Sequence, residues 1–491
     1  MKCWSPVVAA AAFLALAFVG SIAKAAPANL PDSAVGKLGG ELIHHVNADT
    51  AEQIRKWAPT VLSPAIDAGD RADFVNGLVS AVRESGGVEL TEAHTQQGML
   101  VLTVRVHHGG RMVLFVLAAD PAQPGKLGHA ELFPMDDPAA YAGWPKTAVS
   151  RAQMKQLIHA ALDHLVRADD FSGCVTVADG GETVFDECRG LAERDFGVPV
   201  DHQTRFRMAS VGKMFTAVAI GQLVEAGKLS WDSTLARLVP EYPDRAAAKK
   251  ITVWELLHHT SGLGDFFVPA FFEHREKYVD PADYLELIAR QPKHGEPGKD
   301  FNYSNAGYVL LGRIIENVSH EGYFDYIQRH VFAPAGMGSS GFNTLDEVTP
   351  KLAAGYFHES PFSTKWKANW MKIPFKGSPA GDSYSTNADL LRFAEALRSG
   401  KLLKPATLAE MFKNPVPMGP GAIEAGFGER LSHGRHIRGH QGGIEGETTD
   451  LAMIWETGGA VALTSNEGQS QSWLLAEHIA DLLAAEPATT P

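Results

Sequence analysis

Strand-like segments occur at two places that lie far apart in the chain. One is a hairpin signal between Cys174 and Cys188, and the others come close to the C-terminus. The later segments are residues 435–438, 448–456 and 460–466. Between the two places, residues 254–316 alternate helical patterns with loops rich in glycine and proline. We therefore expect one sheet built from both ends of a domain, with a helical region inserted between them and a closing helix over 472–484.

The chain has 491 residues, which is too long for one ordinary domain. Residues 51–85 have helical periodicity, interrupted by Pro59 and Pro64, and three alternating segments follow. These segments are residues 88–91, 98–107 and 111–119. We expect a loose leader over 26–48 and a small α+β accessory domain over 26–147, which ends in a polar boundary. Residues 148–491 then form a mixed α/β domain, mainly an antiparallel sheet flanked by helices.

The first 25 residues have the pattern of a secretory signal peptide. Lys2 precedes the apolar run 7–20, and Ala23-Lys24-Ala25 forms an A-x-A cleavage site. The run is too short to cross a bilayer, although a retained N-terminal anchor is the alternative. We expect an exported protein, periplasmic or secreted, without a transmembrane segment in the mature chain.

The formal net charge is -13. Phosphate binding needs clustered lysine and arginine, so this charge argues against nucleic acid as a partner. Its simplest interpretation is solubility.

Cys174 and Cys188 are equidistant from Gly181, which lies in the turn of the hairpin. Across an antiparallel pair, the two side chains would then face each other on one side of the sheet. An oxidising compartment permits a disulfide between them. Two buried free thiols are the alternative.

Ser210 and Lys213 form a Ser-x-x-Lys element at the start of a long apolar helical pattern. Positions i and i+3 share a helix face, so the hydroxyl and the amine can touch. A serine hydroxyl needs an adjacent base to become nucleophilic, and a desolvated lysine can serve. An isolated Ser-x-x-Lys is more often a solvated helix start, so a catalytic interpretation needs further elements elsewhere in the sequence.

Two further segments supply that context. Tyr303 and Asn305 lie in a loop about 90 residues later. A tyrosine beside cations would lose its proton more easily and act as a general base, and the amide of Asn305 could orient Lys213 and a substrate carbonyl. A helix-capping turn is the alternative. The third element, residues 439–443, contains His440, Gly442 and Gly443 just after a strand. Glycines allow close approach of a substrate, and backbone N–H groups there could form half of an oxyanion hole.

In this order, the three elements resemble those of the serine β-lactamase and penicillin-binding-protein superfamily. Tyr-x-Asn at the middle element is similar to the class C branch, with its carboxylesterase, D-aminopeptidase and D-alanyl-D-alanine carboxypeptidase relatives. Residues 256–263, 379–386 and 426–428 also fit, and the resemblance covers about 165–485. It implies an acyl-enzyme on Ser210, and an oxyanion hole from the backbone of Ser210 and Gly443.

One departure bears on the substrate. Class C enzymes carry Lys-Thr-Gly at the third element, where this chain has His440-Gln441-Gly442. The resemblance therefore favours an esterase or peptidase acting on a small-molecule ester, amide or peptide. A histidine at this position would carry partial positive charge near pH 6–7.

Three functions remain open on the sequence alone. The first is ester or amide hydrolysis, the second is a D-Ala-D-Ala carboxypeptidase or β-lactamase, and the third is a non-catalytic binding protein on this fold. No metal or other cofactor is expected, because the histidine pair 258–259 and the group 433–440 lack HExxH spacing. Aromatic residues could line an acyl site or belong to the core: Phe266, Phe267, Phe271, Phe272, Trp366 and Trp370. The oligomeric state is not readable.

Overall fold

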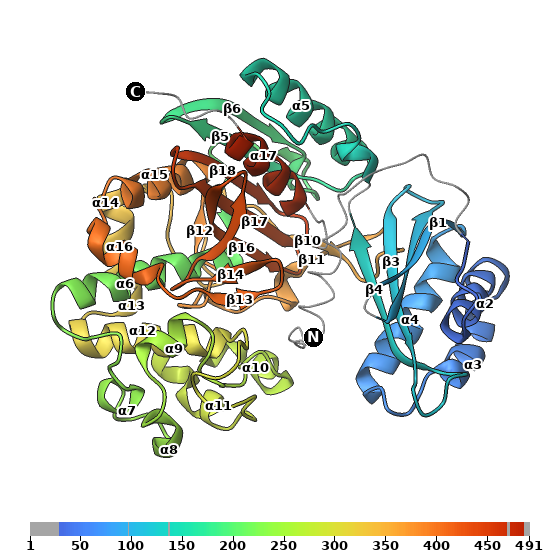
Figure 1. Ribbon diagram of the computed structural model, residues 1–491, viewed down its shortest axis with the longest axis horizontal. Helices are drawn as coiled ribbons and strands as arrows, with labels where there is room; N and C mark the ends of the chain where they lie inside the picture. Colours follow the sequence, from blue (N-terminus) through green and yellow to red (C-terminus); the bar gives the residue numbers. More distant parts are fainter. Residues whose placement is uncertain (1–28, 97, 136–137, 469–471, 486–491) are drawn as a thin grey trace.

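The computed structural model describes residues 29–96, 98–135, 138–468 and 472–485. The segment interpreted as a signal peptide lies outside the described residues. In the described part of the chain, two α/β units are joined by the polypeptide and by a hairpin inserted between them (Figure 1). No described helix is both long enough and apolar enough to cross a bilayer.

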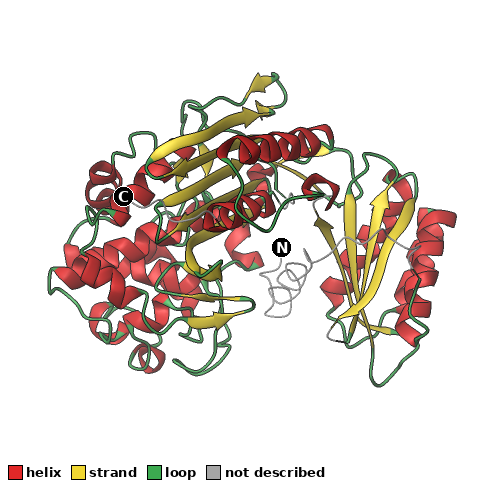
Figure 2. Ribbon diagram, turned by 45° about the horizontal axis from the view of Figure 1, so that its top comes forward, coloured by secondary structure: helices red, strands yellow, loops and turns green. Residues whose placement is uncertain are grey.

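The N-terminal unit packs three helices on one face of a four-stranded antiparallel sheet with order β1-β2-β3-β4 (Figure 2). Its elements are α2 (Ala34–Ala48), α3 (Ala51–Val61), α4 (Ala68–Glu84), β1 (Val88–Gln96), β2 (Met99–Val106), β3 (Met112–Ala119) and β4 (Leu127–Met135). The loose leader expected over 26–48 is wrong, because Ser33 caps a helix whose Leu38 and Leu42 are buried. The strand β4 was also missed.

The larger unit is built on an eight-stranded antiparallel sheet with order β13-β14-β15-β16-β17-β18-β5-β6. The strands are β5 (Gly173–Asp179), β6 (Glu182–Arg189), β13 (Val416–Met418), β14 (Gly421–Ile423), β15 (Gly428–Ser432), β16 (Arg435–Ile444), β17 (Glu447–Ile454) and β18 (Gly459–Ser465). Because β18 pairs with β5, the two ends of the unit form one sheet, as the sequence predicted. β16 continues through the glycine-rich third element, which we expected to follow the strand.

Helices cover both faces of this sheet. On one face lie α5 (Arg151–Arg167) and α17 (Trp473–Ala485), packed on residues such as Val175 and Leu463. The other face holds the main core with α6 (Gly212–Glu225), α12 (Asn305–Ser319) and α15 (Asn387–Arg398). The inserted helical region completes this side. Its shorter helices are α7 (Leu235–Leu238), α8 (Arg245–Ala248), α9 (Val253–Leu257), α10 (Pro269–Glu273), α11 (Leu285–Ala289), α13 (Tyr323–Ile327), α14 (Ala333–Ala335) and α16 (Pro405–Met411).

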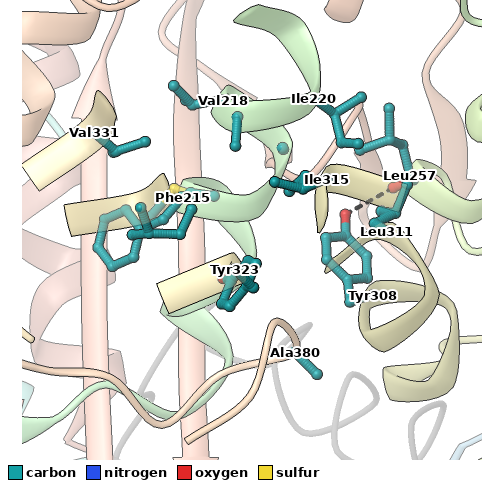
Figure 3. Close-up of a cluster of buried hydrophobic side chains, with 14 of the residues drawn as sticks. Phe215, Val218, Ile220, Leu257, Tyr308, Leu311, Ile315, Tyr323, Val331 and Ala380 are labelled. Atoms are coloured by element: carbon teal, nitrogen blue, oxygen red, sulfur yellow. Dashed lines mark hydrogen bonds between the residues drawn. The ribbon is translucent and has the colours of Figure 1, made fainter. Parts of the chain in front are cut away.

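α6 is the centre of the main core. It is apolar on nearly every side, and Phe215, Val218 and Ile220 are fully buried. Figure 3 shows these side chains among residues of α9, α12 and α13, with the Tyr308 hydroxyl donating to Leu257 O at 2.9 Å. A helix buried all round is rigidly held. Its N-terminus therefore offers a fixed position for catalytic groups.

Short strand pairs supplement the two main sheets. β9 (Phe206–Arg207) pairs with β12 (Tyr384–Ser385) directly before Ser210, and β10 (Tyr356–His358) pairs with β11 (Trp366–Ala368). Another pair joins β7 (Leu191–Glu193) to β8 (Val198–Pro199).

The β10–β11 hairpin connects the two units. Its loop places Phe362, 1% exposed, in the core of the N-terminal unit, with its ring 6.0 Å from that of Phe115. Arg111 of the N-terminal unit donates to Ser363 O at 2.7 Å, and Ser363 donates to Glu84 at 2.6 Å. The N-terminal core thus includes a side chain from the larger unit.

Candidate active site

Ser210 lies in a single 3-10 turn, Ala209–Val211, that leads into α6. Ala209 and Val211 are buried, whereas Ser210 is partly exposed. Ala209 has a φ of 40°, a left-handed conformation that is rare for a residue with a side chain. Gly381 closes the back of the turn, because a Cβ there would lie 2.2 Å from Ala209 O. The turn therefore leaves Ser210 partly exposed, with buried neighbours on both sides.

Lys213 follows one helical turn later and is completely buried. Its Nζ contacts three oxygens: Ser210 Oγ at 3.1 Å, Asn305 Oδ1 at 2.7 Å and Ala380 O at 2.6 Å. Burial lowers the pKa of Lys213 to about 7, against the attraction of Asp265 and Asp382, which raises it. A substantial fraction of the amine is therefore neutral near pH 7 and can accept a proton from Ser210.

Tyr303 lies beside both Ser210 and Lys213. Its ring stacks on His259 at 4.3 Å, lies 4.9 Å from Lys213 Nζ, and its hydroxyl is hydrogen-bonded to Ser210. Burial, the largest cause, raises the pKa of Tyr303, and the Ser210 hydrogen bond offsets only part of this. The expectation that Tyr303 loses its proton more easily is therefore wrong. At neutral pH it is a phenol that can donate a proton.

Asn305 begins α12, and Ser304 caps that helix by accepting from Gly307 N at 3.2 Å. Asn305 orients Lys213 through its Oδ1, while its Nδ2 donates to Asp265 at 2.8 Å. Asp265 also accepts from the backbone N–H of Asn305 at 3.1 Å. Sequence analysis missed Asp265, although a carboxylate within the apolar segment Gly-Leu-Gly-Asp-Phe-Phe was a signal.

β16 forms the third wall of the site. Its pairing with β15 ends at Gly439, while its pairing with β17 continues to Ile444. Backbone groups of residues 440–444 on the β15 side therefore have no strand partner there. Gln441 points toward the face of the sheet that α17 covers and donates to Glu477 of that helix at 3.0 Å. By alternation, His440 and Gly442 face the nucleophile.

Gly442 lies directly against Ser210. A Cβ at this position would lie 3.0 Å from Ser210 N and 2.4 Å from Met208 O. At Gly443 the same test meets nothing within 4 Å, so this residue borders open space. Gly442 thus allows close backbone contact with Ser210, and Gly443 beside it borders open space.

His440 lies near the tyrosine, with the ring centroids 6.4 Å apart. Burial, followed by repulsion from Lys213, lowers the pKa of His440 to about 3. It is therefore neutral at pH 6–7, which corrects the expectation of partial positive charge.

The comparisons with known proteins agree with this geometry. A family model described as Beta-lactamase matches residues 158–485. The chain belongs to the beta-lactamase family. It is 30% identical to penicillin-binding protein 4* of Bacillus subtilis over 332 residues, which cover 63% of this chain and 72% of that protein. It is 27% identical to esterase EstB of Burkholderia gladioli over 308 residues, covering 56% and 76%.

A solved structure is also similar to this family member. The D-amino acid amidase from Ochrobactrum anthropi SV3 has a TM-score of 0.58 and 28% identity, over 68% of this chain and 98% of that chain. The resemblance and the mixed α/β fold expected from the sequence are thus confirmed. The chain is an enzyme, a serine hydrolase of the beta-lactamase family.

The cysteine pair and the histidine clusters singled out in the sequence lie away from the reacting groups or pack on neighbouring side chains. Cys174 and Cys188 face each other across β5 and β6 and are joined in a disulfide. His258 stacks on Trp254, and no group of three potential metal ligands occurs among the described residues.

The aromatic residues divide between core and surface. Phe266 and Phe271 are buried in the main core, and Phe267 and Phe272 pack on it while partly exposed. Trp366 lies 3.9 Å from the Arg194 guanidinium beside the N-terminal unit, and Trp370 is 57% exposed. All four phenylalanines lie on the segment that follows Asp265, and Phe267 and Phe272 are its partly exposed members.

Proposed function

We propose that this serine hydrolase cleaves uncharged esters or amides through an acyl-enzyme on Ser210. The observation that carries the proposal is the 3.1 Å contact between Ser210 Oγ and a completely buried amine, Lys213. The neutral fraction of Lys213 accepts the serine proton as the Ser210 oxygen bonds to the substrate carbonyl carbon. The backbone N–H groups of Ser210 and Gly443 would stabilise the resulting oxyanion.

Tyr303 takes the complementary role. As the bond to the leaving alcohol or amine breaks, the phenol donates its proton to that group and regains one from protonated Lys213. Water then attacks the acyl-enzyme and releases the acid, while Ser210 recovers its proton. The phenol contacts Ser210 and lies beside Lys213, so each transfer is short.

The third element, residues 439–443, favours an uncharged substrate over a peptide with a terminal carboxylate. A carboxypeptidase must bind the terminal carboxylate of its substrate, and a cation is the group suited to that task. His440 is neutral across the physiological range, so it does not supply one. Similarity to an esterase and to an amidase supports the same choice.

A D-Ala-D-Ala carboxypeptidase or β-lactamase is the second candidate, favoured by the similarity to a penicillin-binding protein. A non-catalytic binding role is disfavoured, because Ser210, Lys213, Tyr303 and Asn305 remain assembled with working contacts.

Initial rates on p-nitrophenyl acetate and on a chromogenic cephalosporin distinguish the candidates. We expect ester cleavage by the wild type, and a loss of at least about a thousandfold in Ser210→Ala and Lys213→Met. The exposed Lys228→Ala is the matched control. Rapid Ser210-dependent opening of the cephalosporin would favour the second candidate. Ester hydrolysis that persists in Ser210→Ala would refute the proposal.

We also propose that the protein is exported after cleavage following Ala25, and that residues 26–147 act as an accessory domain. The signal-like pattern supports the first point. The sequence of residues 26–147 contains no catalytic constellation, and the hairpin of the larger unit docks Phe362 in the core of this domain; both observations support the second point.

A further inference from the structure

Asp265 is surrounded by hydrogen-bond donors. Its Oδ1 accepts from the backbone N–H groups of Phe266 at 2.7 Å and Phe267 at 3.2 Å. Its Oδ2 accepts from the backbone N–H of Asn305 at 3.1 Å and from the side-chain Nδ2 of the same residue at 2.8 Å. An ionised carboxylate has acceptors only, so it fits all of these donors, whereas a side chain with N–H groups of its own does not.

The loop that carries Asp265 is fixed against the segment that leads into α12. His259 O accepts from Asn302 N at 2.8 Å, and His259 Nδ1 accepts from Ser304 N at 3.0 Å. Leu263 O accepts from Asn302 Nδ2 at 3.1 Å. Because these contacts join the two segments before Asp265 is reached, the carboxylate has a defined place beside the first residue of α12.

Asp265 determines which way the Asn305 amide faces. The amide has one donor end and one acceptor end. With a carboxylate on one side, Nδ2 must face Asp265, and Oδ1 then faces Lys213 Nζ at 2.7 Å. The reverse orientation would place the amide oxygen against the carboxylate, so that two acceptors would be in contact.

The orientation of Asn305 decides where the Lys213 amine can accept a proton. A neutral amine has two N–H groups and one lone pair. Asn305 Oδ1 and Ala380 O accept from Nζ at 2.7 Å and 2.6 Å, so they take both N–H groups. The lone pair is left for Ser210 Oγ at 3.1 Å, the group that must give up its proton. An amide turned the other way would donate to this lone pair and compete with Ser210.

We propose that Asp265 is a positioning residue that, through Asn305, directs the lone pair of Lys213 at Ser210. This rests on the proposed role of Lys213 as the base. Asp265 acts indirectly, because the group that contacts the amine is the Asn305 oxygen. Residues of three separate segments thus form one hydrogen-bonded chain that ends at the nucleophile.

Other titratable groups also surround Lys213 in the described part of the chain. They are Asp382, His259, His440, Tyr303 and Tyr308. Burial, the largest cause for each ring, lowers the pKa of the two histidines and raises the pKa of the two tyrosines, so all four rings are uncharged near pH 7. Asp382 attracts the amine, as Asp265 does. Both carboxylates therefore favour the ammonium form, and the hydrogen bonds through Asn305 distinguish Asp265.

Asp265→Asn tests the inference with little change in shape. The nitrogen end of the new amide must face either the loop N–H groups or Asn305, so the Asn305 amide is no longer held. We expect kcat for p-nitrophenyl acetate to fall between about tenfold and about a hundredfold, because the lone pair is misdirected. The value of kcat/KM should fall by a similar factor.

Asn305→Leu removes the same link from its other end. This variant should lose a similar factor in kcat, and the double variant should lose at most about threefold more than the larger single loss, because both changes break one chain. Losses that multiply would mean that Asp265 acts independently of Asn305, and they would overturn the inference. Wild-type kcat in folded Asn305→Leu would also overturn it, even if Asp265→Asn does not fold. Circular dichroism checks the folding of each variant.

The titration midpoint of Lys213 separates positioning from general loosening of the site. It is followed at the ε-carbon by ¹³C NMR and assigned with Lys213→Met. Asp265 and the Asn305 oxygen both favour the ammonium form, so Asp265→Asn should lower the pKa of Lys213 by about half a unit or more. A merely loosened site would admit water and raise this pKa from about 7 towards the ordinary value of lysine, because burial is what lowers it. A midpoint that rises or does not move overturns the inference.

Asp283→Asn is the matched control. Asp283 lies in the same helical region and is exposed, and its carboxylate accepts from the backbone N–H groups of Val279 at 3.0 Å and Asp280 at 2.8 Å. Its replacement should change kcat by less than about twofold and leave the Lys213 midpoint in place. Equal effects of the two substitutions would mean that any capping carboxylate in this region matters, and they would overturn the inference.

The midpoint is readable even if the enzyme shows no Ser210-dependent ester hydrolysis. In that case the proposed function fails, while a lowered Lys213 midpoint in Asp265→Asn still supports the inference. If hydrolysis depends on Ser210 but Asp265→Asn changes neither kcat nor the midpoint, the proposed function stands and the inference fails.

Discussion

Replacing Gly442 with alanine places a methyl group between β16 and the nucleophile. The new Cβ would lie 2.4 Å from Met208 O and 3.0 Å from Ser210 N, whereas ordinary contact begins near 3.4 Å. Both neighbours are backbone atoms, and they cannot move aside as a flexible side chain could. The strand must therefore move by about 1 Å relative to Ser210, and a displacement of this size can cost about a hundredfold in rate.

The expected result for Gly442→Ala is a loss of about a hundredfold in kcat/KM for p-nitrophenyl acetate. This corresponds to about 2.7 kcal/mol of transition-state stabilisation. Active-site titration with a fluorophosphonate counts the competent enzyme, and circular dichroism checks that the variant is folded.

Gly428→Ala on the neighbouring strand is the matched control. Its new Cβ would meet only Gly439 O, at the ordinary distance of 3.6 Å, so activity should stay within about threefold of the wild type. If folded Gly442→Ala matched this control, the close seating of β16 against Ser210 would not matter for catalysis, and the reasoning would be refuted.

Burial lowers the pKa of Lys213 to about 7, and the amine must be neutral to act as a base. The value of kcat/KM should therefore fall about tenfold per pH unit below pH 7 and level off above it. A profile that is flat from about pH 5 to about pH 8 would contradict this role of Lys213. Phe362→Ala should lower the free energy of unfolding of the N-terminal unit by about 3–5 kcal/mol, because it empties a buried site, whereas Trp370→Ala, exposed on the same segment, should cost less than about 1 kcal/mol. Urea denaturation followed by circular dichroism measures both, and equal effects of the two substitutions would contradict the docking role of Phe362.

Much of the fold followed from local pattern. The apolar periodicity after Ser210 predicted α6, and the spacing of Cys174 and Cys188 predicted their register across the hairpin. Strand β4 was missed, because its residues mix polar and apolar side chains on both faces and lack clear alternation. The leader over 26–48 was misjudged, because its helix is stabilised by packing on the neighbouring sheet.

The sequence by itself determined which groups could meet locally. Ser210 and Lys213 must share a helix face because they are three residues apart, and this holds whatever surrounds them. Only the tertiary structure decided their protonation. The pKa of a group depends on how completely distant segments remove it from water, and the sequence pattern does not report that quantity. Burial by such segments makes Lys213 a base near pH 7, keeps Tyr303 a phenol and leaves His440 neutral.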